Sequence, residues 1–143
     1  MSNPSVERLY GVCTTLYKNE SGLPHRLDGP AKEMRYECGK LISQSWYING
    51  YKHREDGPAE EFGDDRKWWY CNGKLHNISG PAVIFNSDMV HDGLQWWING
   101  INYTKENYDL QLINNKFNTM TLGKDKNDLL QSLTTNLKNI KLN

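Results

Sequence analysis

The sequence has few cysteines, no excess of charge and no long apolar run, and each of these absences argues against a class of protein. Its three cysteines, Cys13, Cys38 and Cys71, are odd in number and form no CxxC pair, which argues against a disulfide framework or a zinc knuckle. Lysine plus arginine and aspartate plus glutamate both number 17, so bulk charge does not favour a nucleic-acid partner. No stretch approaches the roughly 18 apolar residues of a membrane span.

Aliphatic residues are also scarce, and aromatic residues are expected to supply much of the burial. Hydrophobic residues make up 37% of the 143 positions, and 11% of the chain is aromatic, with five tryptophans and eight tyrosines. The length suits one domain and leaves no room for two independent cores. Residues 1–4 show no basic patch followed by an apolar run, so we expect no signal peptide. Because unpaired thiols favour a reducing compartment, we predict a cytoplasmic protein.

The chain contains several copies of one short motif. Residues 53–59, HREDGPA, nearly copy residues 25–31, HRLDGPA, and residues 76–82, HNISGPA, form a diverged third copy. A second, aromatic motif reads WYING, WYCNG and WWING, and it occupies residues 46–50, 69–73 and 96–100. Self-similarity of this kind predicts an array of one small structural unit, here present about four times.

Each aromatic motif ends in Asn-Gly, the strongest short-range signal of a β-hairpin, because both residues tolerate the positive φ of a type I′ turn. A two-residue turn fixes the residues that face each other across the hairpin. The predicted pairs are Tyr47 with Lys52, Ile48 with Tyr51, Tyr70 with Leu75, Cys71 with Lys74, Ile98 with Ile101, and Trp96 with Tyr103. In the first two hairpins the same register sets an aromatic residue opposite a motif histidine.

Alternation along these strands predicts two aromatic faces. The first is a structural stripe made of Trp46, Trp69 and Trp96, with Ile48, Cys71 and Ile98 on the same face. The second, which we call the aromatic row, is made of Tyr47, Tyr70 and Trp97. Arg26, Lys52, Arg54 and Lys74 would place positive charge beside the row. The three row residues together with Lys52 and Arg54 are the candidate binding residues. Two interpretations stay open: the row packs inside the protein, or it is exposed and binds a ligand or partner.

The motif histidines His25, His53 and His76 recur in register, so they form a ladder and do not converge on one point. A metal site needs three or four ligands around one ion, which such a ladder does not provide. We therefore predict a structural role in which each histidine packs near the facing aromatic residue, while Asp28 and Asp56 secure the Gly-Pro turns. The sequence shows no catalytic motif, and we predict no catalytic residue, metal or cofactor.

The C-terminal 40 residues change in character. Thr104 is a suitable helix N-cap, and Tyr108, Leu112, Ile113 and Phe117 follow at helical spacing. A second amphipathic stripe is formed by Leu129, Leu130, Leu133, Leu137 and Ile140. We predict two helices that cap the last hairpin or, alternatively, bind a partner or a second copy of the chain.

These observations predict a mainly β, single-domain fold, α+β overall. An antiparallel β-meander of hairpin repeats spans residues 1–103, with the run from Val6 to Tyr17 supplying its first strand. Residues 104–143 form the helical cap or partner-binding segment.

The two motifs together resemble the MORN-like repeats, in the variant W-Y-x-N-G-x-x-H-R-x-D-G-P-A that is common in phage and giant-virus proteins. The resemblance covers residues 16–108. It weakens in the third copy, where Asn77 stands in the arginine position and Ser79 in the aspartate position. It implies a repeat fold and contacts with proteins or membranes, but no particular activity.

We therefore predict a non-enzymatic protein that presents a face of its sheet to another protein. By the resemblance, this is a phage or viral accessory protein that acts on a host factor in the host cytoplasm. The alternative is a small-ligand binder that stacks a nucleotide or carbohydrate on the aromatic row.

Overall fold

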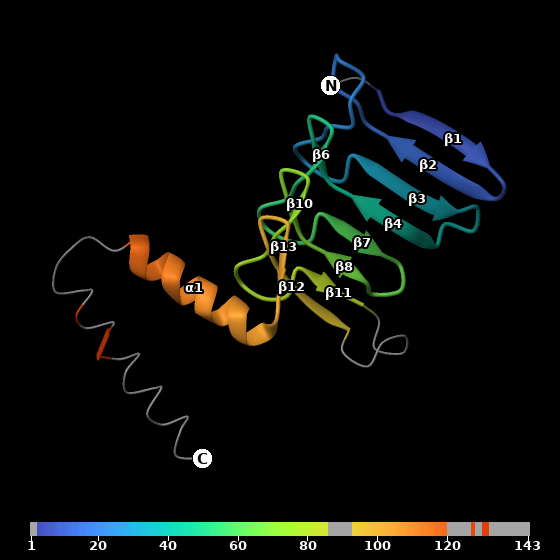
Figure 1. The fold of residues 1–143 in the computed structure, drawn as a ribbon. Coiled ribbons are helices and arrows are strands. Elements are labelled where there is room, and N and C mark those ends of the chain that lie inside the picture. The colour runs from blue at the N-terminus through green and yellow to red at the C-terminus, as the bar shows by residue number, and fades with distance from the viewer. Residues whose placement is uncertain (1–2, 86–92, 120–126, 128–129, 132–143) are drawn as a thin grey trace. The chain divides into compact units, whose positions relative to one another are not determined.

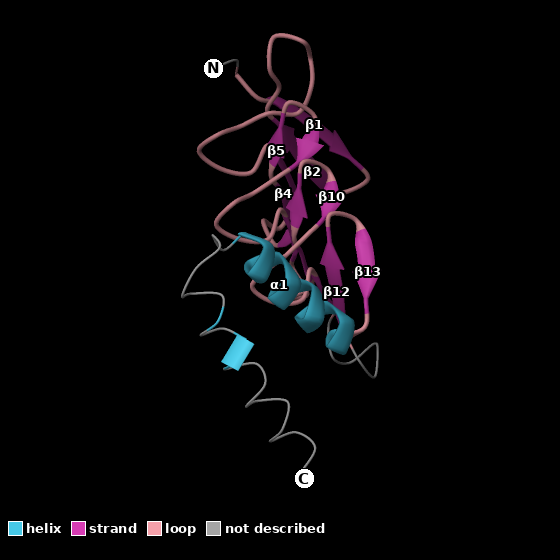
Figure 2. Cartoon of the chain, turned by 60° about the vertical axis from the view of Figure 1, so that its left-hand side comes forward, coloured by secondary structure: helices cyan, strands magenta, loops and turns pink. Residues whose placement is uncertain are grey.

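The computed structural model describes residues 3–85, 93–119, 127 and 130–131. The chain divides into two units, Met1–Thr104 and Lys105–Asn143. The first unit is all β and the described part of the second is helical (Figures 1 and 2).

A nine-stranded antiparallel sheet forms most of the first unit, and its strands follow one another in chain order. The strands are β1 (Ser5–Leu9), β2 (Val12–Leu16), β3 (Lys32–Tyr36), β4 (Leu41–Ser45), β7 (Glu60–Phe62), β8 (Lys67–Trp68), β11 (Val83–Ile84), β12 (Leu94–Ile98) and β13 (Ile101–Tyr103). The predicted antiparallel meander is thus confirmed.

Two small hairpins complete the first unit, and they come from the aromatic motifs. They are β5 (Tyr47–Ile48) with β6 (Tyr51–Lys52), and β9 (Tyr70–Cys71) with β10 (Lys74–Leu75). The third aromatic motif forms the end of β12, which pairs with β13. In Figure 1 these hairpins form a second column beside the larger strands. All six predicted cross-strand pairs are present.

The Asn-Gly turns have the backbone conformation that the sequence predicted. Asn49 and Gly50 have φ angles of 47° and 86°, and the other two Asn-Gly pairs repeat this pattern. The N-terminal run was predicted as one strand, which is wrong, because it folds into the hairpin of β1 and β2. Tyr10 and Gly11 form its turn with φ angles of 50° and 77°. Tyrosine carries no signal for such a turn, so this hairpin was missed.

The motif alanines form the centre of a small core. Ala31, Ala59 and Ala82 are 0% exposed. Each alanine carbonyl also accepts a hydrogen bond at 2.8 Å from a backbone N–H at the start of a hairpin segment, and the donors are Tyr17, Trp46 and Trp69 respectively. The alanine carbonyl therefore anchors the residue at which each hairpin segment begins.

Helix α1 (Lys105–Thr119) confirms the first predicted helix, with Tyr108 buried. Lys105 forms an ion pair with Asp109 one turn along. The second predicted helix falls mostly on residues outside the described part of the chain. Within the described residues, no helix has the length and apolar character needed to cross a membrane.

Candidate binding site

Successive hairpins are joined by a hydrogen bond that uses the motif histidine. The histidine Nδ1 of one copy accepts from the backbone N–H of the asparagine in the next Asn-Gly turn. The pairs are His25 with Asn49 at 3.1 Å, His53 with Asn72 at 3.2 Å, and His76 with Asn99 at 3.1 Å. An imidazole that accepts at Nδ1 is unprotonated there, so the histidines act as structural acceptors.

Backbone hydrogen bonds add to this connection. The turn glycine of each later hairpin donates at 2.8 Å to a carbonyl of the preceding copy: Gly50 to Pro24, Gly73 to Lys52, and Gly100 to Leu75. The residue after each histidine donates to the following hairpin as well: Arg26 to Tyr47, Arg54 to Tyr70, and Asn77 to Trp97. These hydrogen bonds fix the position of each hairpin relative to the next.

We expect the substitution His53→Ala to lower the free energy of unfolding by about 1 kcal/mol, the net value of a typical hydrogen bond. The loss stays small because Asn72 is exposed, so water can replace the missing acceptor. Denaturant unfolding measures the change, and amide hydrogen exchange should become faster at Asn72. Unchanged stability together with unchanged exchange at Asn72 would contradict the structural role.

The motif arginine of the second copy lies between an aromatic ring and a glycine. The Arg54 guanidinium carbon is 4.0 Å from the centroid of the Trp46 ring. On Gly57, a Cβ would lie only 3.1 Å from that carbon, so glycine lets the backbone approach the guanidinium closely. Arg54 Nε donates to Asp56 at 2.8 Å, and this hydrogen bond lowers the pKa of the aspartate. We call this arrangement the arginine sandwich.

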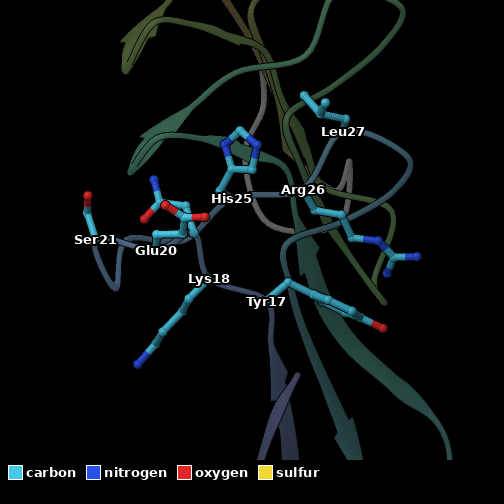
Figure 3. A pocket seen from close by; sticks show the side chains of 8 residues that line it. Tyr17, Lys18, Glu20, Ser21, His25, Arg26 and Leu27 are labelled. Atoms are coloured by element: carbon cyan, nitrogen blue, oxygen red, sulfur yellow. The ribbon is translucent and has the colours of Figure 1, made fainter. Parts of the chain in front are cut away.

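The first copy contains a second arginine sandwich. The Arg26 guanidinium carbon is 4.1 Å from the Tyr17 ring centroid, and a Cβ on Gly29 would lie 3.2 Å from it. Arg26 Nε donates to Asp28 at 2.8 Å, which lowers the pKa of that carboxyl. Figure 3 shows the Tyr17 ring and the Arg26 side chain extending in the same direction.

The third copy replaces the sandwich with neutral groups. Asn77 Nδ2 donates to the carbonyl of Pro81 at 2.9 Å, and Arg54 donates likewise to Pro58 at 3.3 Å. The Asn77 side-chain oxygen accepts from the backbone of Ser79 at 2.9 Å. The diverged residues therefore hold the loop in place without charge.

Two grooves lie beside the arginine sandwiches. The first has a volume of about 510 Å³ and includes Tyr17, His25 and Leu27 in its lining. The second has a volume of about 820 Å³, with Trp46 and Ile48 among its lining residues. Arg26 and Leu27 line both, so the two grooves are adjacent and share these residues as their border. Leu27 is 74% exposed at their shared border, where a partner can reach it.

Lys52, one of the candidate binding residues, contacts the Tyr70 ring of the aromatic row. Lys52 Nζ lies 5.0 Å from the Tyr70 ring centroid and 5.9 Å from that of Trp68. Lys52 also forms an ion pair with Glu60, and the two side chains are only 23% and 12% exposed. Lys52 is thus a partly buried cation beside the row, and it already has an anion partner and aromatic contacts. Tyr47, which pairs with Lys52 across the hairpin, is itself half-buried.

Burial raises the pKa of Tyr47 and Tyr70, and the Glu60 carboxylate raises it further. In the unfolded chain these phenols ionise around pH 10.0, the ordinary pKa of tyrosine. At that pH the folded state still keeps them protonated, because its pKa values are higher. The stability that they contribute is complete below about pH 10 and is lost as the pH rises through the folded-state pKa values. We expect the variant Y47F/Y70F to show a smaller loss of unfolding free energy between pH 9 and pH 11 than the wild type. An equal loss in both proteins would contradict this assignment.

The other candidate residues make different contacts. The Arg54 guanidinium stacks on Trp46, while its backbone N–H donates to the Tyr70 carbonyl at 3.4 Å. Trp97 donates from Nε1 to Gln95 at 3.0 Å. The backbone carbonyl of Trp69 accepts from the backbone N–H of His76 at 3.0 Å, and Trp96 pairs with Tyr103 across the β12–β13 hairpin.

The described residues contain no cluster of three histidine, cysteine or acidic side chains that could hold a metal ion. Cys13 and Cys71 are half-buried and Cys38 is exposed, each as a free thiol.

Sequence reasoning missed Tyr17 and Leu27 as groove residues, and it named Arg26 only as a positive charge beside the aromatic row. Tyr17 occupies the place of Trp46, but it lies eight residues before its histidine (25 − 17) and Trp46 lies seven before (53 − 46). The extra residue hid the match, although the shared hydrogen bond to a motif alanine makes the positions equivalent.

Comparison of the chain with family models, with characterised proteins and with solved structures finds no match in any of the three.

Proposed function

We propose that this chain is a non-enzymatic binding protein whose hairpins, built from MORN-like repeats, present the two adjacent grooves to a partner protein. The observation that carries the proposal is that the grooves share Arg26 and Leu27 as lining residues and so lie next to each other. A surface that runs past two successive copies of one motif suits an extended partner segment. With the resemblance to phage and giant-virus repeats, we extend the proposal to a viral accessory protein acting on a host factor.

The composition of the grooves supports a protein partner. Apolar floor residues, Trp46 and Ile48, lie beside charged side chains that are already paired within the loops, such as Arg54 with Asp56. Interfaces between proteins combine an aromatic or arginine centre with a polar rim in this way. The aromatic row is the weaker candidate, because Lys52 already contacts Glu60 and Tyr70.

Affinity capture with matched variants tests the proposal. Leu27→Asp places a charge at the border of both grooves, and Leu9→Asp places the same charge on β1, outside them. Leu27 and Leu9 are 74% and 57% exposed, so we expect both variants to keep the wild-type melting temperature. The proposal predicts a protein captured by the wild type and by Leu9→Asp and lost with Leu27→Asp. If Leu27→Asp captures the same proteins as Leu9→Asp, the groove is not the binding surface.

A further inference from the structure

The two arginine sandwiches differ in the hydrogen bonds that their guanidinium groups donate. Arg54 Nη1 donates to Glu61 at 3.2 Å and to the carbonyl of Pro58 at 3.3 Å, in addition to the bond from Nε. Arg26 donates from Nε to Asp28, but its two terminal nitrogens have no hydrogen-bond partner among the described residues. The side chain is nevertheless only 25% exposed and is held by Tyr17 and Gly29.

The sequence explains why Arg26 lacks an internal acceptor. Glu33 stands two residues after its motif alanine, as Glu61 does in the next copy. The Glu33 carboxylate accepts from Arg35 at 2.9 and 3.1 Å, so it is already engaged. The position equivalent to Arg35 in the next copy is Gly63, which leaves Glu61 available to the arginine of its own sandwich.

We infer that the terminal nitrogens of Arg26 bind the carboxylate of an acidic side chain in the partner protein. This inference rests on the proposed function, because it names the chemistry of the segment that enters the grooves. A guanidinium offers two parallel N–H groups that match the two oxygens of a carboxylate. Stacking on Tyr17 fixes the plane of these donors, so little side-chain entropy is lost when the carboxylate binds.

Neighbouring charges favour a carboxylate over a phosphate group. Asp28 is bound to the same guanidinium and its side chain is 58% exposed, and Glu20 also lines the first groove. These carboxylates repel a dianion more strongly than a monoanion. Beyond Arg26 the second groove continues over Trp46 and Ile48, which are apolar. The segment that fits is therefore one with an acidic residue close to an apolar one.

Peptide titration of the full-length ¹⁵N-labelled chain tests the inference. The probes are three peptides Ac-Gly-X-Gly-Leu-Gly-NH₂ in which X is glutamate, glutamine or phosphoserine, and the signals are Arg26 Nε–H and the Gly29 amide. We expect the glutamate peptide to bind about tenfold more tightly than the glutamine peptide, which corresponds to one charge-assisted hydrogen-bonded pair. Arg26→Gln should remove this difference, and Arg26→Lys should reduce it, because lysine keeps the charge but not the paired donors.

Arg66→Gln is the matched control. Arg66 also stacks on a ring, that of Phe62 at 4.3 Å, and pairs with an aspartate, Asp64, but it lies outside both grooves. It should leave the preference for glutamate unchanged. The inference is overturned if the glutamate and glutamine peptides bind equally, if no peptide shifts Arg26, if the preference persists in Arg26→Gln, or if phosphoserine binds more tightly. If the glutamate and glutamine peptides bind equally but still shift the NMR signals of Trp46 and Ile48, the carboxylate site is overturned and the groove function stands. The groove function itself is tested by the Leu27→Asp capture.

Discussion

The substitution Lys52→Met should lower the free energy of unfolding by about 2–3 kcal/mol, somewhat less than the ~3–5 kcal/mol for breaking a fully buried ion pair. The reason is that the Glu60 carboxylate loses the charge that balances it. The Glu60 side chain is 12% exposed and lies near the half-buried rings of Tyr47 and Tyr70, so its charge is poorly solvated once the ammonium group is gone. Denaturant unfolding at pH 7 measures the loss.

The double variant K52M/E60M separates the ion pair from simple packing. When both charges are replaced by apolar groups of similar size, no uncompensated charge remains, and most of the lost stability should return. Because Met in place of Lys52 still packs on Tyr70, a double variant as unstable as Lys52→Met would show that the loss does not come from the uncompensated carboxylate.

Gly57→Ala should lower the free energy of unfolding by about 1–2 kcal/mol, the range of mild overpacking. The new Cβ would lie 3.1 Å from the Arg54 guanidinium carbon, and this group is held by its contact with the Trp46 ring and by hydrogen bonds to Asp56 and Glu61. Gly80→Ala is the matched substitution in the third copy, where the nearest atom is Asn77 Nδ2 at an ordinary 3.8 Å. It should be neutral or slightly stabilising, because alanine restricts the unfolded chain.

A double-mutant cycle assigns the effect to the arginine. In an Arg54→Asn background, which copies the third motif, Gly57→Ala should cost no more than about 0.5 kcal/mol. Two results would contradict the sandwich as the cause: an equal cost of Gly57→Ala in both backgrounds, or an equal cost for Gly57→Ala and Gly80→Ala in the wild type.

The hairpins could be predicted from the sequence because their determinants are local. Asn-Gly selects a type I′ turn, and a two-residue turn fixes every pair across it, so pairs such as Tyr47 with Lys52 followed directly. The same reasoning failed at Tyr10-Gly11, where the turn has the same backbone conformation without the asparagine that signals it.

The candidate site could be predicted only in part, because it depends on contacts between copies. Alternation placed Trp46 and Ile48 on one face correctly, and both line the second groove. It could not show that Arg54 stacks on Trp46, since that requires the loop to fold back over the ring. Nor could it show that Lys52 has an anion partner eight residues away in Glu60.

The most direct test of the groove as the binding surface is site-specific photo-crosslinking. A benzophenone amino acid that replaces Leu27 lies at the border of the two grooves. The same amino acid in place of Tyr36, which is exposed, lies outside both grooves. The proposed function predicts a covalent adduct from position 27, with the protein that the wild type captures, and none from position 36. An adduct with that protein from position 36 and none from position 27 would contradict it.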